Sequence, residues 1–221
     1  MNRKIAVFVI SAFIAMVFAS CKSAQKQPAA QATPPSPASA TAAPPTSNIA
    51  TVKIETYTAG KQTVTLTRTA DGKFTTDIGG RTLSAETGAS RELTISEGGK
   101  RIASGINEGD KLKLKSPDGS LILELKFKVD KIKVTLDENS TPWELKIKAD
   151  KIKVDKDAKE YGDIKYKAEN GKLKAKNAAK QEMASTKDVP RLSALLSPFL
   201  MDGVDQEKRD LLLITLFTLD R

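Results

Sequence analysis

Apolar and polar residues alternate along most of the chain between Ile49 and Lys176. Segments such as QTVTLTRT, RELTIS and KLKLK place Val, Leu or Ile at alternate positions. A period of two residues is typical of strands that have one face on a core and the other in solvent, and β-branched residues favour this conformation. The pattern therefore predicts an antiparallel sheet made of many short strands.

Turn-forming dipeptides separate these segments and set the expected register. Asp118-Gly119 and Asn170-Gly171 supply the positive φ angles of tight hairpin turns, whereas Asp130-Lys131 is a poorer turn for which a bulge is the alternative. Each turn keeps the apolar positions of its two strands on one face of the sheet. The expected pairs are Leu112–Leu125, Leu114–Leu123, Phe127–Val134, Val129–Ile132, Tyr166–Ala175 and Ala168–Leu173.

An internal repeat lies within the β-rich region. LELKFKVDKIKV at residues 123–134 returns as WELKIKADKIKV at 143–154, and a weaker copy occupies 163–176. Duplicated hairpins favour a meander, and about twelve strands are too many for one flat open sheet. We therefore expect residues 49–221 to form one mainly β domain, an antiparallel meander curled into a barrel or a strongly coiled sheet.

The periodicity changes after Ser185, and helices are expected over about 188–221. Asp188 and Pro190 predict the start of a first helix, which Pro198 interrupts. Asp205 predicts the N-cap of a last helix, and this helix is apolar on nearly every side from Leu211 onward. Such a helix is buried all round, although a strand is the alternative for the same residues. At ~1.5 Å per residue it is too short to cross a bilayer.

A second apolar stretch occupies residues 5–20, after Arg3 and Lys4. The basic start, the brief apolar run and the small residues before Cys21 are typical of a secretory signal peptide. Val17-Phe18-Ala19-Ser20-Cys21 also resembles the lipobox of bacterial lipoproteins. The resemblance implies cleavage between Ser20 and Cys21, with diacylglycerol and a further acyl chain such as palmitate on Cys21. An ordinary signal peptide or a short anchor, with an incidental cysteine, is the alternative.

The segment from Cys21 to residue 48 consists largely of Ala, Pro, Ser, Thr and Gln and has no apolar periodicity. This composition predicts a disordered tether between a lipid-bearing cysteine and the β-rich domain. Two or more acyl chains anchor a protein stably to a bilayer. We therefore expect the protein to be attached to a cell membrane or outer membrane through Cys21, facing the periplasm or the exterior.

The composition excludes several classes of enzyme. The chain contains no histidine and one cysteine, which excludes Ser-His-Asp and Cys-His catalysis and metal sites built from histidine. The segment from Asp155 to Glu160 resembles part of a calcium loop but lacks the required glycine and final glutamate. The sequence therefore predicts no catalytic residue, no metal site and no cofactor, and a protein that is not an enzyme.

Lysines form the most distinctive chemical pattern of the β-rich region. Residues 111–176 contain 18 Lys and 12 acidic residues but no Arg, for a formal charge of +6. The lysines alternate with apolar residues and are expected on the outer face. They suit a surface that binds anionic lipid, acidic glycan or a negatively charged envelope protein, but not nucleic acid. The alternative is a solvated face that prevents aggregation. The candidate residues are Lys126, Lys128, Lys146, Lys148, Lys165 and Lys167.

The Lys-x-Lys strands and the final segment RDLLLITLFTLDR are similar to the tubby, scramblase and LURP-one-related group. In that group a closed β-barrel encloses a hydrophobic C-terminal helix. The resemblance implies the same architecture here, and no binding residue matches well enough to transfer. We expect a lipid-anchored lipoprotein with a non-catalytic binding or structural domain. A carrier with an apolar cavity for a lipid or a lipoprotein is the alternative function.

Overall fold

The computed structural model of the chain describes residues 50–57, 60–69 and 71–220, which form fourteen strands, two 3-10 segments and one α-helix. The strands are β1 (Ala50–Thr56), β2 (Gln62–Arg68), β3 (Phe74–Ile78), β4 (Arg81–Thr87), β5 (Glu92–Glu97), β6 (Lys100–Ile106), β7 (Lys111–Lys115), β8 (Leu121–Phe127), β9 (Lys131–Thr135), β10 (Trp143–Ile147), β11 (Lys151–Lys156), β12 (Lys159–Lys167), β13 (Lys172–Asn177) and β14 (Glu182–Thr186). The helical segments are η1 (Ala168–Asn170), η2 (Ala194–Leu200) and α1 (Gln206–Thr218).

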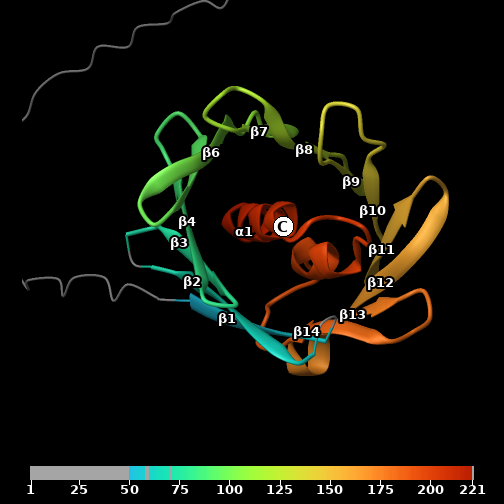
Figure 1. Ribbon diagram of the computed structural model, residues 1–221. Helices are drawn as coiled ribbons and strands as arrows, with labels where there is room; N and C mark the ends of the chain where they lie inside the picture. The colour runs from blue at the N-terminus through green and yellow to red at the C-terminus, as the bar shows by residue number, and fades with distance from the viewer. Residues whose placement is uncertain (1–49, 58–59, 70, 221) are drawn as a thin grey trace, which may run out of the picture. The chain divides into compact units, whose positions relative to one another are not determined.

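The strands form a closed antiparallel barrel, as the sequence predicted (Figure 1). Each strand pairs with its neighbours along the chain, and β1 pairs with β14 to close the ring. The observed fourteen strands exceed the expected number of about twelve. One reason is that β14 lies beyond the alternating region, because Ala184, Ser185 and Thr186 are all buried and leave no polar-apolar alternation to detect.

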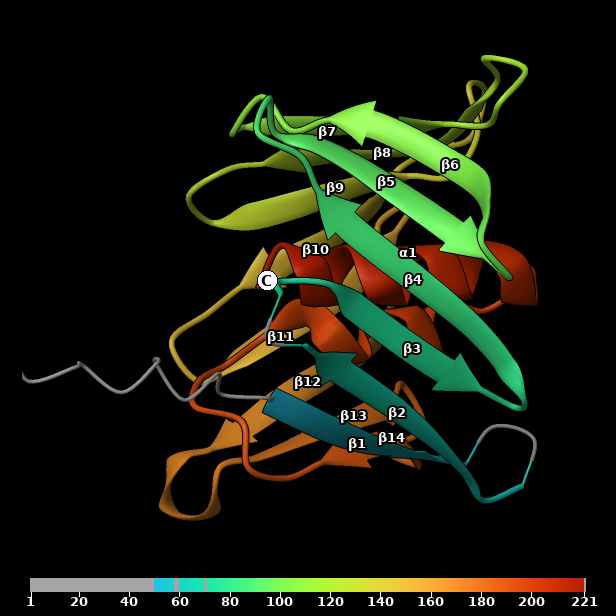
Figure 2. The same ribbon diagram turned by 90° about the vertical axis from the view of Figure 1, so that its left-hand side faces the viewer.

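Helix α1 lies inside the barrel, so the prediction of a buried last helix is confirmed and the strand alternative is wrong (Figures 1 and 2). All six residues from Leu211 to Leu216 are buried. The one hydroxyl among them, on Thr215, donates to the carbonyl of Leu211 at 2.6 Å, which avoids the cost of an unpaired buried polar group. Asp205 caps the helix as expected, because its carboxylate accepts from the backbone N–H of Lys208 at 2.9 Å.

The first C-terminal helical segment differs from the expectation. It begins at Ala194 rather than near Asp188, and Ser193 caps it by accepting from the N–H of Leu195 at 3.1 Å. Asp188 has a φ of 60° and lies in a connection whose Val189 N–H donates to the carbonyl of Gly171 at 3.0 Å. This hydrogen bond holds the connection against the turn between β12 and β13, so the helix starts later. Inside the barrel, η2 packs against β11 to β14 and against α1.

The hairpin registers test the predicted pairs. Leu112 pairs with Leu125 and Leu114 with Leu123, as expected. The other two hairpins are displaced by two residues, because Phe127 pairs with Ile132 and Tyr166 with Leu173. In the first, the turn lies at Val129-Asp130 and not at Asp130-Lys131, because the Lys128 N–H donates to the Lys131 carbonyl at 2.8 Å. In the second, η1 makes the loop longer than the assumed two-residue turn. A shift of two keeps every strand side chain on its expected face, but it moves Val129 out of the sheet, and this side chain is fully exposed.

Arg81, at the start of β4, links the barrel wall to α1. Its guanidinium donates to Glu97 of β5 at 2.6 Å and 3.0 Å, and to Asp210 of α1 at 3.3 Å. Burial raises the pKa of the Asp210 carboxyl, while hydrogen bonds from Gln206 and Arg81 oppose this shift. The Arg81 hydrogen bond lowers the pKa of Glu97. This ion pair network fixes the polar first turn of α1 at one end of the barrel.

We expect Leu212→Ala to reduce the free energy of unfolding by about 2–5 kcal/mol, because it opens a cavity at a fully buried position where the surroundings relax only in part. The measurement is urea unfolding followed by circular dichroism. Val129→Ala is the control and should change the free energy by less than about 0.5 kcal/mol, because its side chain is exposed. Equal effects of the two substitutions would contradict a core built around α1.

Candidate functional site

The six predicted lysines come from three strands and point outward. Lys126 belongs to β8, Lys146 to β10, and Lys165 and Lys167 to β12, while Lys128 and Lys148 directly follow β8 and β10. The inward residues beside them, such as Leu125, are buried. The alternation of side chains along each strand places these lysines on the outer surface of the barrel.

Ion pairs divide the six lysines into two groups. The Nζ of Lys126 lies 2.6 Å from Glu124, and that of Lys146 lies 2.7 Å from Asp155. Among the residues that the structure describes, the other four make no ion pair: Lys128, Lys148, Lys165 and Lys167. The two groups therefore have different local roles.

The paired lysines belong to a band of alternating charge across the outer face. Lys126 lies directly opposite Lys133, and Lys146 opposite Lys153, an arrangement that by itself destabilises a sheet. Carboxylates from the same strands neutralise the repulsion. Glu144, for example, accepts contacts from Lys131 at 3.1 Å and Lys133 at 3.2 Å. For this band, the structure supports the interpretation of a solvated face that stabilises the sheet.

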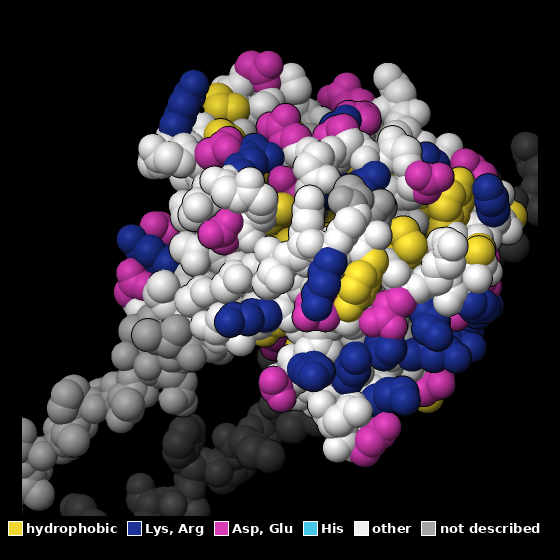
Figure 3. Space-filling view, turned by 60° about the horizontal axis from the view of Figure 1, so that its bottom comes forward, with side chains coloured by type: hydrophobic (Ala, Val, Ile, Leu, Met, Phe, Trp, Pro, Cys, Tyr) yellow, Lys and Arg dark blue, Asp and Glu magenta, His cyan; other side chains and the backbone are white. Residues whose placement is uncertain are grey.

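The unpaired lysines gather at one end of the barrel. Because the strands are antiparallel, β1 begins at the same end as the loops 107–110, 128–130, 148–150, 168–171 and 187–193, and we call this end the basic end. In Figure 2 it lies on the left. Figure 3 shows the surface formed by the strands at the bottom of Figure 1. Positive side chains crowd the lower part of this surface. The lysines of this end without an ion pair, among the described residues, are Lys111, Lys128, Lys148, Lys151, Lys165, Lys167, Lys172 and Lys187.

The positions of two residues of the basic end were not predicted from the sequence. Lys187 lies outside the alternating region, and closure of the barrel by β14 brings it next to the β12–β13 turn. Val129 was expected to face the core opposite Ile132, but it lies at an exposed loop tip. The repeat itself offered a signal for the second case, because the equivalent position in the next copy is Ala149, a small and also exposed residue.

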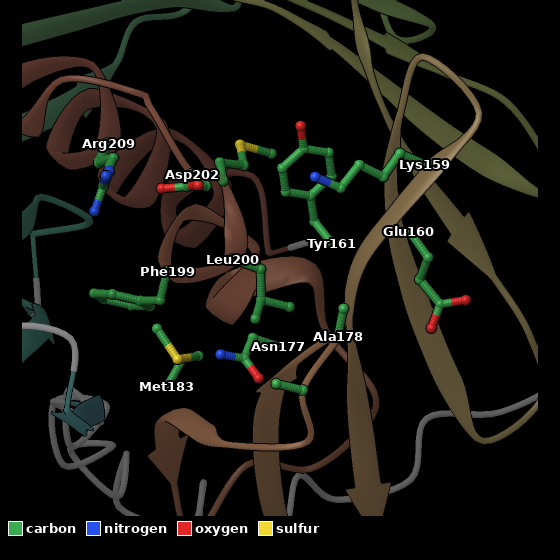
Figure 4. Close-up of a pocket in the computed structure, with 12 residues that line it drawn as sticks. Lys159, Glu160, Tyr161, Asn177, Ala178, Met183, Phe199, Leu200, Asp202 and Arg209 are labelled. Carbon is green, nitrogen blue, oxygen red and sulfur yellow. The ribbon is translucent and has the colours of Figure 1, made fainter.

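A pocket of about 380 Å³ lies between β12, β13 and η2 (Figure 4). Met183, Phe199 and Leu200 form its apolar side. Its charged residues have other partners: Glu160 accepts from Lys153 at 2.6 Å, and the Lys159 ammonium lies 4.9 Å from the ring centre of Tyr161. Figure 4 shows Glu160 pointing away from Tyr161. These side chains do not form an acid–base pair aimed at one point of the pocket, so the geometry assigns no catalytic role to this pocket.

The described residues contain no group of three or more His, Cys, Asp or Glu side chains that could hold a metal ion. The segment considered for calcium forms the β11–β12 hairpin. Its Asp157 and Ala158 have φ angles of 50° and 62° and make a tight turn. The carboxylates of this segment are therefore spaced by the alternation of side chains along two strands and their turn. No helix in the described ranges has the length and apolar character needed to cross a membrane.

We expect the band of paired charges to make part of the stability depend on pH. Hydrogen bonds from Lys131 and Lys133 hold the pKa of Glu144 below its ordinary value of 4.5. A carboxylate with a lowered pKa stabilises the fold above that ordinary value, and this contribution is lost as the pH falls through the pKa of the folded state. Glu144→Gln should therefore cost up to about 1 kcal/mol at pH 7 and almost nothing at pH 3. Unfolding in urea at both pH values provides the measurement.

Glu138→Gln is the matched control for Glu144→Gln, because Glu138 is an exposed loop residue outside the band of paired charges. We expect it to leave the difference between the two pH values unchanged. An equal response of both variants would show that the pairing with Lys131 and Lys133 does not contribute.

Comparisons with known proteins found no match: no protein-family model, no curated protein and no solved structure matches this chain. The function is therefore inferred from the residues and from the geometry described above.

Proposed function

We propose that this protein is a lipid-anchored lipoprotein of the cell envelope, whose barrel acts at the membrane surface as a non-catalytic binding or structural domain. The observation that carries the proposal is the sequence Val17-Phe18-Ala19-Ser20-Cys21 after a short apolar run, which has the features of an exported, acylated N-terminus. These residues, and the tether that ends at residue 48, lie outside the described residues. The barrel begins directly after that tether, at Ala50.

The chemistry of the barrel supports a non-catalytic role. The chain has no histidine, so catalysis would depend on carboxylates, lysines or hydroxyl groups. The more enclosed carboxylates of the outer face are engaged with lysines, as Asp155 is with Lys146 and Glu144 is with Lys131. Asp210, the buried acid of α1, accepts hydrogen bonds from Gln206 and Arg81 and anchors the helix. Each of these groups has a structural explanation.

The filled interior favours this function over a lipid carrier. A carrier needs an apolar space that its ligand can enter. Here the inner faces of the strands pack against α1 and η2, and Leu212, Ile214 and Leu216 are completely buried. Two of the pockets that open toward solvent measure about 380 Å³ beside η2 and about 360 Å³ at the basic end. We carry no function over from the tubby, scramblase and LURP-one-related group.

We expect Cys21→Ala to abolish acylation, because the thiol is the only group in the chain that can carry a thioether-linked diacylglycerol. The measurement is incorporation of labelled palmitate in bacterial cells, together with the mass of the N-terminal peptide. Ser20→Ala is the control and should be processed normally, because it keeps a small residue before the cleavage site. If the Cys21→Ala variant incorporated as much label as the unchanged chain, Cys21 would not be the acylated residue.

A further inference from the structure

We propose that the basic end of the barrel lies against the bilayer and binds anionic phospholipid headgroups, with the tip of the β8–β9 loop entering the interface. This orientation deepens the proposed function and rests on it for the presence of the membrane. Three independent features of the basic end carry it: clustered positive charge, exposed apolar loop tips beside a recess with apolar lining, and the position at which β1 begins.

The first feature is the charge of the basic end. Eight lysines there make no ion pair with any residue that the structure describes, whereas the loops named above contribute the carboxylates Glu108, Asp110, Asp130, Asp150, Glu169 and Asp188. The opposite end presents the acidic surroundings of the first turn of α1, including Asp137, Asp202, Asp205 and Glu207, together with cations such as Lys100 and Arg101. At the basic end, four of the unpaired lysines lie in or beside the loops 148–150 and 168–171: Lys148, Lys151, Lys167 and Lys172. Clustered lysines are attracted to anionic lipid surfaces within about one Debye length.

The second feature is apolar surface in the same place. Val129 is fully exposed, and Ile106 is 59% exposed at the end of β6. The loops that carry such positions are held side by side: the Phe127 N–H donates to the Asp110 carbonyl at 2.7 Å, and the Ile147 N–H donates to the Asp130 carbonyl at 2.8 Å. Apolar tips beside basic residues are typical of surfaces that enter the headgroup region of a bilayer.

A recess with apolar lining lies next to the β8–β9 loop. It has a volume of about 360 Å³, and Ile132, Ile147, Ile152 and Leu192 contribute to its lining. Lys128 and Lys148 also line it and make no ion pair with other described residues, whereas Arg191 and Asp220, which line it too, pair with each other. A recess that combines apolar lining with two unpaired lysines fits a molecule that carries a negative headgroup next to a hydrocarbon chain. This combination favours anionic phospholipid over an acidic glycan, which would use the charge but not the apolar surface.

The third feature is connectivity. β1 begins at Ala50 at the basic end, so the segment from Cys21 joins the barrel on this side. An acyl anchor on Cys21 raises the local concentration of headgroups near the lysines of the barrel to which it is joined. With the basic end against the bilayer, the end that holds the first turn of α1 faces away from it.

The first experiment uses the chain from Lys22 to Arg221, which lacks the acylated cysteine but keeps every buried apolar residue of the core, from Ile54 to Leu216. This chain has no cysteine, so Val129→Cys accepts a single environment-sensitive NBD fluorophore. We expect its emission to brighten and shift to the blue on addition of vesicles containing phosphatidylcholine and phosphatidylglycerol. Vesicles of phosphatidylcholine alone should produce no change.

Asn139→Cys, labelled in the same way, is the matched control. Asn139 is an exposed residue of the loop between β9 and β10, at the opposite end of the barrel. Its fluorescence should not respond to either kind of vesicle. A response at position 139 equal to that at position 129, or a response at neither position, would overturn the proposed orientation.

The second experiment compares two sets of four substitutions with the same change of charge. Replacing Lys148, Lys165, Lys167 and Lys172 with Gln should weaken co-sedimentation with anionic vesicles at least tenfold. The control set at the opposite end should keep the affinity within about threefold, and circular dichroism checks that both sets fold. Raising the salt concentration should weaken binding of the unchanged chain. The control replaces Lys100, Arg101, Lys115 and Lys176 with Gln.

The outcomes separate this inference from the proposed function. Equal losses in both sets, or retention on an immobilised acidic glycan without binding to vesicles, would overturn lipid docking while leaving acylation of Cys21 untouched. Conversely, failure of acylation would leave vesicle binding by the unacylated chain in place, because that chain binds through the basic end alone.

Discussion

The packing of α1 inside the barrel is the constraint on which the rest of the structure depends. The fourteen described strands close into a barrel. A closed sheet of this size encloses more space than the inward side chains of its strands can fill. Helix α1 and η2 fill the remainder. An ordinary amphipathic helix would leave its polar face unpaired in that interior, whereas Leu211 to Leu216 present apolar groups in every direction.

Polar groups at the first turn of α1 determine how the helix sits in the barrel. Asp210 is buried, and this burial raises the pKa of its carboxyl. The guanidinium of Arg81, on the wall of the barrel, compensates by donating a hydrogen bond to that carboxyl. Lys208 contacts Asp137 of the β9–β10 loop at 2.7 Å. These contacts lie at the end opposite the basic end. The helix is therefore held by charge at one end and by apolar packing along its length.

The outer surface follows a different rule. Alternation forces a polar residue at each outward position, and lysine at successive strands creates repulsion between directly opposed residues such as Lys126 and Lys133. Carboxylates such as Glu144 relieve this repulsion between neighbouring strands. At the basic end, lysines such as Lys148 and Lys167 make no ion pair with any described residue. Whether a lysine is paired thus follows from which carboxylate the neighbouring strand places beside it.

The sequence by itself determined which side chains face inward and outward, the curling of the sheet and the burial of the last helix, because these depend on local periodicity and on total apolar content. It also determined the pair Leu112–Leu125, where Asp118-Gly119 dictates a short turn. Only the tertiary structure decided the displaced turn at Val129, the longer loop before Gly171, the late start of η2 and the pairing of β1 with β14. These depend on contacts between residues far apart in the chain, such as Val189 with Gly171. The separation of six similar lysines into paired and unpaired groups has the same origin, because the carboxylate that reaches a lysine is set by the register of neighbouring strands.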